Sequence, residues 1–256
     1  MTTIPARIAS LLLPAIAVLA LGACDKPAAE QPSAAAGTTG AANAAPGLAD
    51  LARPENVAKV AESTLPKGDP ATPTSAYRRL DSGNQVMFMY YALAGLPVAY
   101  EDIAQAWSAE YRRTSDGFRR QDLLTALQPR INASVKQAAD GRYVLLEQAG
   151  SSLLGRYDFA KKAFAVKEYG ESGRYTYFSD NSSYTLGTTN GESYASLPVP
   201  DEAAARKIEG HLSNHTNLRL QTYAFAQDAD PGERRVRLQV MKVRLLGPGG
   251  EMLAEM

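Results

Sequence analysis

Hydrophobic positions in the first half of residues 51–256 follow the spacing of helices. Residues 84–94 (NQVMFMYYALA) are apolar on nearly every side and are followed by Gly95, which predicts a buried helix. In residues 100–111, apolar and aromatic side chains recur three and four positions apart, so we expect a helix that buries one face. A short helix is also expected to begin at Pro54, because proline is favoured in a first turn.

A further helix is predicted to start near Ser115 or Asp116 and to end before Pro129, because proline disrupts the interior of a helix. Its apolar side chains are expected to be buried, and they are Phe118, Leu123, Leu124 and Leu127. The residues after Pro129 no longer follow this spacing.

From residue 131, apolar and polar positions alternate, which is typical of strands. Residues 131–135 and 143–146 are predicted to form two strands joined by a hairpin turn at Asp140-Gly141. Further strands are expected within 154–168 and 174–187.

The C-terminal part combines one helix with a long hairpin. Residues 201–212 carry acids at their start and an apolar stripe, which predicts a helix. Strands are expected over 217–227 and 234–246, and the turn at 247–250 should lead into a short last strand.

The second strand of this hairpin contains a break in its alternation. Because a one-residue slip would turn half of its apolar side chains to the wrong face, we predict a β-bulge near Met241 and Lys242. The apolar residues that change parity there are Val236, Leu238, Val240, Val243 and Leu245.

Helices followed by mostly antiparallel strands, with one further helix, predict an α+β fold. Residues 51–256 are expected to form one globular domain, which can divide into a helical lobe over 51–130 and a β-rich lobe over 131–256.

The N-terminus has the organisation of a secretory signal peptide. Arg7 precedes an apolar run over 8–21, and small residues lead from this run to Cys24, the single cysteine of the chain. The run is shorter than the ~20 residues that a membrane-spanning helix needs. The sequence Leu21-Gly22-Ala23-Cys24 resembles the lipobox of bacterial lipoproteins.

This resemblance implies that residues 1–23 are removed by cleavage between Ala23 and Cys24, and that Cys24 then carries diacylglycerol and a further fatty acyl chain such as palmitate. Several acyl chains hold a protein firmly on a bilayer, whereas one chain holds it only marginally. In enteric bacterial lipoproteins an aspartate after the cysteine, here Asp25, implies retention in the inner membrane. We therefore expect a periplasmic domain anchored to that membrane.

Composition adds a tether and argues against several classes of partner. Residues 24–50 are dominated by Ala, Pro and Gly after the cysteine, so this segment is expected to be disordered. Lys plus Arg and Asp plus Glu each total 27, and this balance disfavours nucleic acid as a partner. With Cys24 lipidated, the domain has no thiol for a disulfide or for nucleophilic catalysis.

Patterns that could carry chemistry are weak. His211 and His215 are four apart, but no glutamate follows the first as in zinc metalloproteases, and Gly210 and Ser213-Asn214 indicate that a helix ends there. Residues 228–233 are acidic without the ligand spacing of a calcium loop. Tyr157 and Lys161 have the spacing of short-chain dehydrogenases without the glycine-rich nucleotide turn. We therefore assign no catalytic residue, metal or cofactor.

One compositional feature points to binding. Residues 170–197 are dominated by Tyr, Ser, Gly, Thr and Asn, which are favoured in binding loops because a tyrosine ring gives contact area at low entropy cost. Tyrosine is equally common on strands, so ordinary strand faces with polar turns are the alternative explanation. The candidate binding residues are Tyr175, Tyr177, Tyr184 and Tyr194.

These observations favour a membrane-tethered module that binds an envelope protein, peptide or glycan without catalysis. Two alternatives are an envelope hydrolase acting on peptide or glycan, which needs a deep pocket with convergent acids or an activated serine, and a structural assembly subunit, which needs a large exposed apolar patch.

Overall fold

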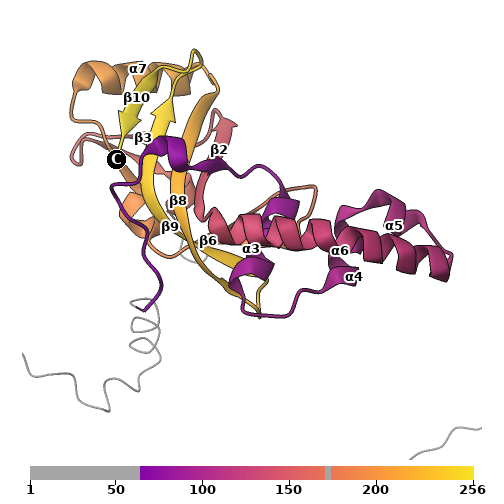
Figure 1. Ribbon diagram of the computed structural model, residues 1–256. Coiled ribbons are helices and arrows are strands. Elements are labelled where there is room, and N and C mark those ends of the chain that lie inside the picture. The colour runs from indigo at the N-terminus through magenta and orange to yellow at the C-terminus, as the bar shows by residue number, and fades with distance from the viewer. Residues whose placement is uncertain (1–63, 171–173) are drawn as a thin grey trace, which may run out of the picture. The chain divides into compact units, whose positions relative to one another are not determined.

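The computed structural model describes residues 64–170 and 174–256, and all of them belong to one compact unit (Figure 1). Helices and two β-sheets are both present, which confirms the α+β class. The expected signal peptide, the tether and the short helix at Pro54 lie outside the described residues, as do Ala23, Cys24 and Asp25.

The large sheet contains seven strands, six of which are neighbours along one path while the last strand joins β9. In that order they are β1 (Arg78–Arg79), β2 (Tyr143–Gly150), β8 (Leu218–Asp230), β9 (Arg235–Leu246), β6 (Thr185–Thr188) and β5 (Tyr175–Tyr177), and β10 (Met252–Glu255) pairs with β9. Strand β1 is parallel to β2 and β6 is parallel to β9, whereas the other pairs are antiparallel.

The predicted bulge in β9 is confirmed by the register of the central hairpin. Tyr223 is opposite Lys242 but Ala224 is opposite Val240, so Met241 is the extra residue. The shift keeps the apolar residues before and after it on one face. A second shift lies in β8, where Ala226 is opposite Leu238 and Asp228 is opposite Arg237.

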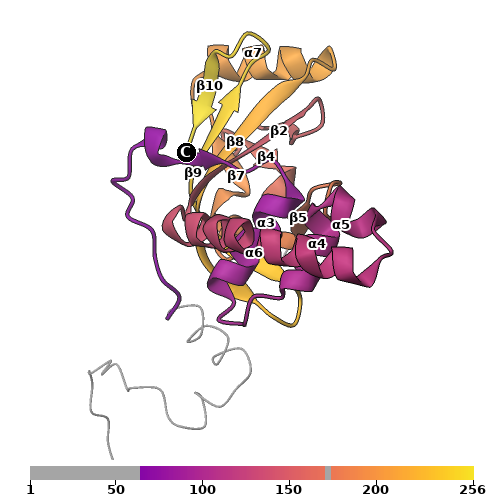
Figure 2. The ribbon, with the colours of Figure 1, turned by 45° about the vertical axis from the view of Figure 1, so that its right-hand side comes forward.

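Four helices form a layer at one end of the long strands (Figure 2). They are α3 (Gly83–Leu93), α4 (Tyr100–Trp107), α5 (Ala109–Arg113) and α6 (Gly117–Asp140). Helix α3 packs on β8 and β9, and the other helices pack around α3 and one another. The single helix expected over 100–111 is interrupted, because Ser108 is extended and its hydroxyl accepts a hydrogen bond from the Tyr111 amide to begin α5.

Helix α6 corrects the expectations for residues 118–141. It continues through Pro129, so the strand expected over 131–135 and the hairpin turn at 140–141 are wrong. Pro129 is exposed, which lets water satisfy the carbonyl that lacks an amide partner. The expected boundary between the lobes 51–130 and 131–256 falls inside this helix. Phe118 was expected in the core but is 89% exposed in the first turn.

The other end of the long strands packs against a smaller layer. This layer contains a second sheet of β3 (Leu154–Asp158), β4 (Ala163–Val166) and β7 (Ser196–Pro198), together with α7 (Glu202–Ser213), as Figure 1 shows. Helix α7 begins where expected, because Asp201 accepts a hydrogen bond from the Ala203 amide. Three short 3₁₀ segments complete the fold, namely η1 (Thr74–Ala76), η2 (Lys167–Tyr169) and η3 (Gly191–Tyr194).

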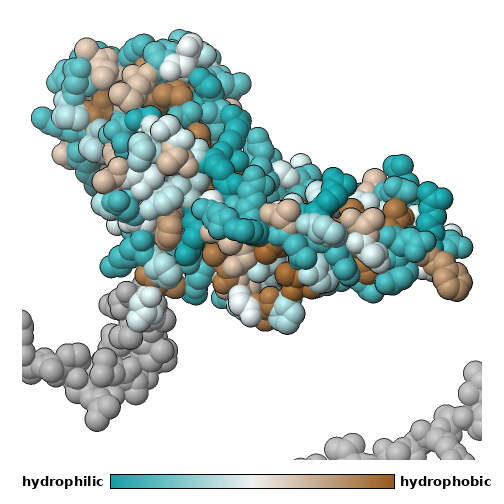
Figure 3. All heavy atoms as spheres, viewed as in Figure 1, coloured by the Kyte–Doolittle hydropathy of each residue, from teal (hydrophilic) through white to brown (hydrophobic). Residues whose placement is uncertain are grey.

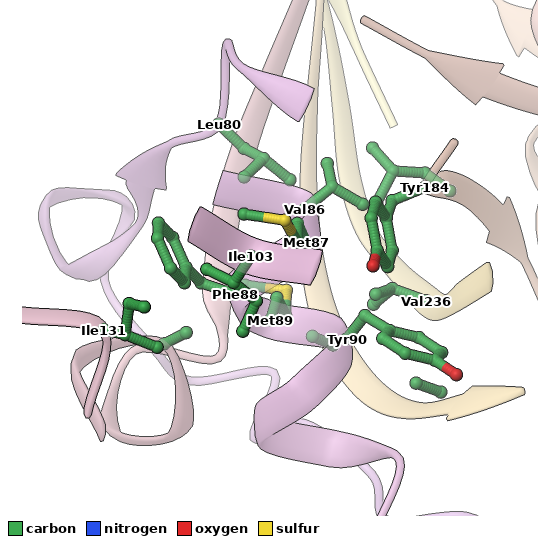
Figure 4. Close-up of a cluster of buried hydrophobic side chains, with 14 of the residues drawn as sticks. Leu80, Val86, Met87, Phe88, Met89, Tyr90, Ile103, Ile131, Tyr184 and Val236 are labelled. Carbon is green, nitrogen blue, oxygen red and sulfur yellow. The ribbon is translucent and has the colours of Figure 1, made fainter. Parts of the chain in front are cut away.

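The two layers produce two hydrophobic clusters that share the strands β8 and β9. The helical cluster is shown in Figure 4, and β8 contributes Ala224 and Ala226 to it. The second cluster takes Leu218 and Leu220 from the same strand. Between them lies Thr222, which is buried and hydrogen-bonded to the Tyr169 hydroxyl. The inner face of one continuous hairpin therefore links both cores.

An N-terminal strap, residues 64–77, crosses the outer face of the sheet. The Pro66 carbonyl accepts a hydrogen bond from Gln227 Nε2 at 2.8 Å, and the Gly68 amide donates to Gln239 Oε1 at 2.9 Å. A Cβ at Gly68 would lie 2.7 Å from the Cβ of Phe225, so the close approach requires glycine. The ring of Tyr77 packs edge-on against two tyrosines of the sheet, Tyr143 and Tyr223.

The N-terminus of α3 is capped by a carboxylate that is distant in sequence. Asp180 accepts hydrogen bonds from the Ser82 hydroxyl at 2.6 Å and from the Gly83 amide at 2.8 Å. Burial tends to raise the pKa of Asp180, but these hydrogen bonds outweigh burial and lower it below its usual value. The ionised carboxylate therefore ties the loop after β5 to the helical layer.

We predict that Asp180→Ala lowers the free energy of unfolding at pH 7 by about 1 kcal/mol, as the loss of a helix cap usually does. Because the folded-state pKa lies below the unfolded-state value, this stabilisation is full above the unfolded pKa and disappears as the pH falls through the folded pKa. Urea unfolding at pH 7 and pH 3 should show the difference between wild type and variant shrinking in acid. Asp122→Ala, which removes an exposed carboxylate on α6, is the control; an equal loss at both pH values would refute the capping role.

Candidate functional site

The structure separates the four candidate tyrosines into three environments. Tyr175 and Tyr177 lie on β5 and are 53% and 56% exposed. Tyr184 is buried in the helical cluster, where Figure 4 shows it beside Tyr90 and Val236, and its hydroxyl donates to Tyr91 at 3.3 Å. Burial raises the pKa of Tyr184. Tyr184 is part of the core, so the prediction that it lies on a binding surface is wrong.

Tyr194 also departs from the expected surface. It lies in η3 and packs against the second cluster, with its ring centroid 6.3 Å from that of Tyr169. Burial raises the pKa of Tyr194 as well. Only Tyr175 and Tyr177 are therefore brought together, with ring centroids 6.4 Å apart and an interplanar angle of 36°.

An arginine completes the exposed pair, and we call Tyr175, Tyr177 and Arg235 the β5 platform. The guanidinium of Arg235 lies 5.3 Å from the centroid of the Tyr175 ring, which is within the range of a cation–π contact. Glu233 holds the same guanidinium through an ion pair at 2.8 Å. Gly187 lies between them on β6, and a Cβ there would come within 2.7 Å of Arg235 Cδ, so only glycine lets the arginine reach Tyr175.

Strand β5 lies at the end of the large sheet, and within residues 64–170 and 174–256 it pairs with β6 alone. An edge strand presents main-chain N–H and C=O groups that can pair with another extended chain. Because side chains alternate along a strand, Tyr175 and Tyr177 stand on one face and Thr176 on the other. The edge therefore offers backbone groups and two aromatic rings side by side.

The inner face of β5 lies against a small cavity that is lined by both polar and apolar side chains. Thr176 donates to Glu168 at 2.6 Å, and Tyr169 is bonded to Thr222 on the central strand. Burial raises the pKa of Tyr169, and its hydrogen bond to Thr222 offsets only part of that effect, so the phenol stays protonated. The cavity measures about 30 Å³, which suits a water molecule and excludes a larger ligand.

A second, open groove lies between β3 and α7, with a volume of about 570 Å³. Phe159, which is 84% exposed, stands at its side. The charged groups around it are already paired: Arg156 with Glu209 at 2.8 Å and Arg206 with Glu202 at 3.6 Å. The groove therefore has an apolar wall and self-compensating charges at its rim.

The weak chemical patterns remain apart or have structural partners. His211 lies in the last turn of α7, whereas His215 follows the helix with a positive φ of 50°. The Tyr157 hydroxyl donates to the Val199 carbonyl at 2.9 Å, and Asp230 accepts from the Gly232 amide at 2.8 Å within its turn. In the described part of the chain, no three His, Cys, Asp or Glu side chains converge as metal ligands.

Of the helices within 64–170 and 174–256, none is long and apolar enough to cross a membrane. Comparisons with protein family models, curated proteins and solved structures give no match to this chain.

The composition of residues 170–197 pointed to the two exposed tyrosines, but Arg235, Gly187 and the open edge of β5 were missed, because only the sheet order brings them together.

Proposed function

We propose that this protein is a lipid-anchored module of the bacterial envelope that binds an extended peptide segment of another envelope protein at the β5 platform. The observation that carries the proposal is the pair of exposed tyrosines on a strand with an open edge. Cys24 in its lipobox-like context supports the anchor and the compartment. Catalysis has no part in this function.

Binding by strand addition uses both elements of the β5 platform. A peptide lying along β5 exchanges main-chain hydrogen bonds, each worth about 0.5–1.5 kcal/mol net, and these provide affinity for any extended sequence. Tyr175 and Tyr177 then contact alternate side chains of the peptide, which provides selectivity. The guanidinium over Tyr175 is already paired with Glu233, so its remaining N–H groups favour a carbonyl oxygen of the ligand at that position.

We predict that Tyr175→Ala/Tyr177→Ala reduces the affinity for peptides selected on the wild-type domain by at least about tenfold, because two aromatic contacts of roughly 1 kcal/mol each are lost. A displayed library of random peptides provides the ligands, and titration calorimetry measures the affinities. Both side chains are exposed, so the free energy of unfolding should change by no more than about 0.5 kcal/mol.

Phe159→Ala is the matched control, because it removes an aromatic side chain at the β3–β4 turn that is even more exposed than the two tyrosines. It should leave peptide affinity unchanged. In the wild-type complex, amide hydrogen exchange should slow along β5. Selected peptides that bind the double variant as well as the wild type, or that protect a different strand, would refute the proposed site.

A further inference from the structure

The connection between α3 and α4 is an uncharged surface segment. Residues 83–100, which span α3 and its connection to α4, include no charged residue. The second part of this stretch, 91–100, reads Tyr-Ala-Leu-Ala-Gly-Leu-Pro-Val-Ala-Tyr. We call residues 91–100 the apolar loop. Gly95 turns the chain with a φ of 65°, and Leu96 is 43% exposed just after it.

Part of the apolar loop is held by the core and part is left in the open. Leu93, Val98 and Tyr100 pack against the helical cluster, and the Tyr100 hydroxyl donates to Asn132 at 2.8 Å. Leu96 and Pro97 are exposed beyond them. Figure 3 shows apolar residues gathered along the lower margin of the surface, over the region of α3 and α4. A fixed base with an exposed apolar tip is suited to contact a non-aqueous surface.

The described residues begin at the same end of the domain as the apolar loop. The Pro66 carbonyl is hydrogen-bonded to Gln227, and Gln227 lies three residues before the end of β8. The strap therefore starts beside the tip of the β8–β9 hairpin. That tip also contacts α3, because the Tyr90 hydroxyl lies 3.5 Å from the Pro231 carbonyl oxygen. Figures 1 and 2 both place the start of the strap and the α3–α4 connection on the lower side.

We propose that the apolar loop rests on the bilayer to which Cys24 is anchored, with Leu96 among the acyl chains. This inference rests on the lipid anchor of the proposed function. Tyr91 and Tyr100 form the two ends of the loop and stay packed on the helical cluster, so Leu96 and Pro97 are the side chains that reach the bilayer. The tether and the loop then reach the membrane from one side of the domain.

The charge around the loop defines the lipid. Glu101 and Asp102 follow it directly and are exposed, so the contact does not rely on anionic headgroups and suits zwitterionic phosphatidylethanolamine. One leucine with a neighbouring proline is too small an anchor to hold a protein by itself. The acyl chains on Cys24 supply the local concentration that makes so weak a contact effective. The domain then adopts one orientation instead of swinging freely on its tether.

A fluorescence measurement on the full lipidated chain tests this inference. Because lipidation consumes the thiol of Cys24, Pro97→Cys provides the single reactive thiol, next to Leu96. A polarity-sensitive fluorophore there should shift to the blue in phosphatidylethanolamine–phosphatidylcholine vesicles and lose at least about half of its emission to acyl-chain nitroxide lipids. The same label at Phe159→Cys, beside Tyr157 in the layer of the second cluster, should show neither change.

Leu96→Asp in the Pro97→Cys background should return the label to water while the protein still floats with vesicles, and circular dichroism should show an unchanged fold. If the lipidated protein floats but the label at 97 behaves like the label at 159, the docking inference is wrong and the anchor stands. If neither this protein nor a Cys24→Ser variant floats, the anchor itself is wrong. A blue shift that appears equally in detergent and grows with protein concentration would assign the loop to a second copy of the chain.

Discussion

Replacing Phe164 by alanine is expected to lower the free energy of unfolding by about 3–5 kcal/mol, the range for truncating a buried phenylalanine. Phe164 on β4 is fully buried in the second cluster, and its ring centroid lies 5.0 Å from that of Tyr157. Chemical denaturation followed by circular dichroism measures the loss. The control is Phe159→Ala, which removes an exposed ring from the same layer and should cost less than about 0.5 kcal/mol.

The same variant tests whether the two layers unfold together. Trp107 is the only tryptophan of the chain and lies in the helical layer, where its ring is 5.2 Å from that of Phe88. Because β8 and β9 contribute to both clusters, loss of the Phe164 ring should shift the midpoint of Trp107 fluorescence as far as that of circular dichroism. A fluorescence midpoint that stays at the wild-type value would mean that the helical layer unfolds independently.

Ile131→Ala is expected to cost about 2–5 kcal/mol, because Ile131 is fully buried where α6 packs on α3. A helix and a strand predict different neighbours for it. In the helix, Ile131 and Ala138 share the buried face and Ala133 points to solvent, whereas the alternation of a strand would place 131 and 133 on one face.

Ala133→Asp is therefore the matched control for Ile131→Ala, and urea denaturation should show it to be tolerated within about 0.5 kcal/mol. A severe loss of stability in Ala133→Asp, comparable to that of Ile131→Ala, would contradict the helical assignment of this segment.

The alternation of apolar residues was sufficient to predict a strand and its register where the strand is long and one of its faces is buried. The change of parity in β9 located the bulge at Met241, because only an extra residue keeps Val240 and Val243 on the same face. The same reasoning failed over 131–135, since Ile131 and Val135 are spaced both for alternation and for one turn of a helix. Pro129 then favoured the wrong choice, because proline usually ends a helix. Here it occupies an exposed helical position, which tolerates proline better than a buried one.

Burial was predicted less well than element type. Phe118 has the spacing of a buried residue, but it lies in the first turn of α6 and is almost wholly exposed. Tyr184 has the composition of a binding loop around it, but it precedes β6 and turns toward Tyr90 and Tyr91 in the core. Each outcome depends on what lies opposite the side chain in space, which local sequence does not contain.

The candidate site was predictable in part. The alternation of Tyr175, Thr176 and Tyr177 indicates a strand with two rings on one face. That this strand ends the sheet within residues 64–170 and 174–256 follows from the parallel pairing of β6 with β9, which joins segments far apart in the chain. Arg235 reaches Tyr175 for the same reason, so the β5 platform could be found only once the sheet order was known.

The strap over the outer face of the sheet also determines how the domain responds to mechanical force. A pull on the chain before Thr64 loads the contacts of the strap in their order along the chain, among them Pro66–Gln227, Gly68–Gln239, Asp69–Tyr143 and last the Tyr77 ring between its two partners. These contacts are loaded one at a time, as in peeling, so each gives way at low force. Their release lengthens the connection by about 50 Å at most before tension reaches β1 and the sheet. The strap can thus detach and extend before the pulling force acts on the sheet.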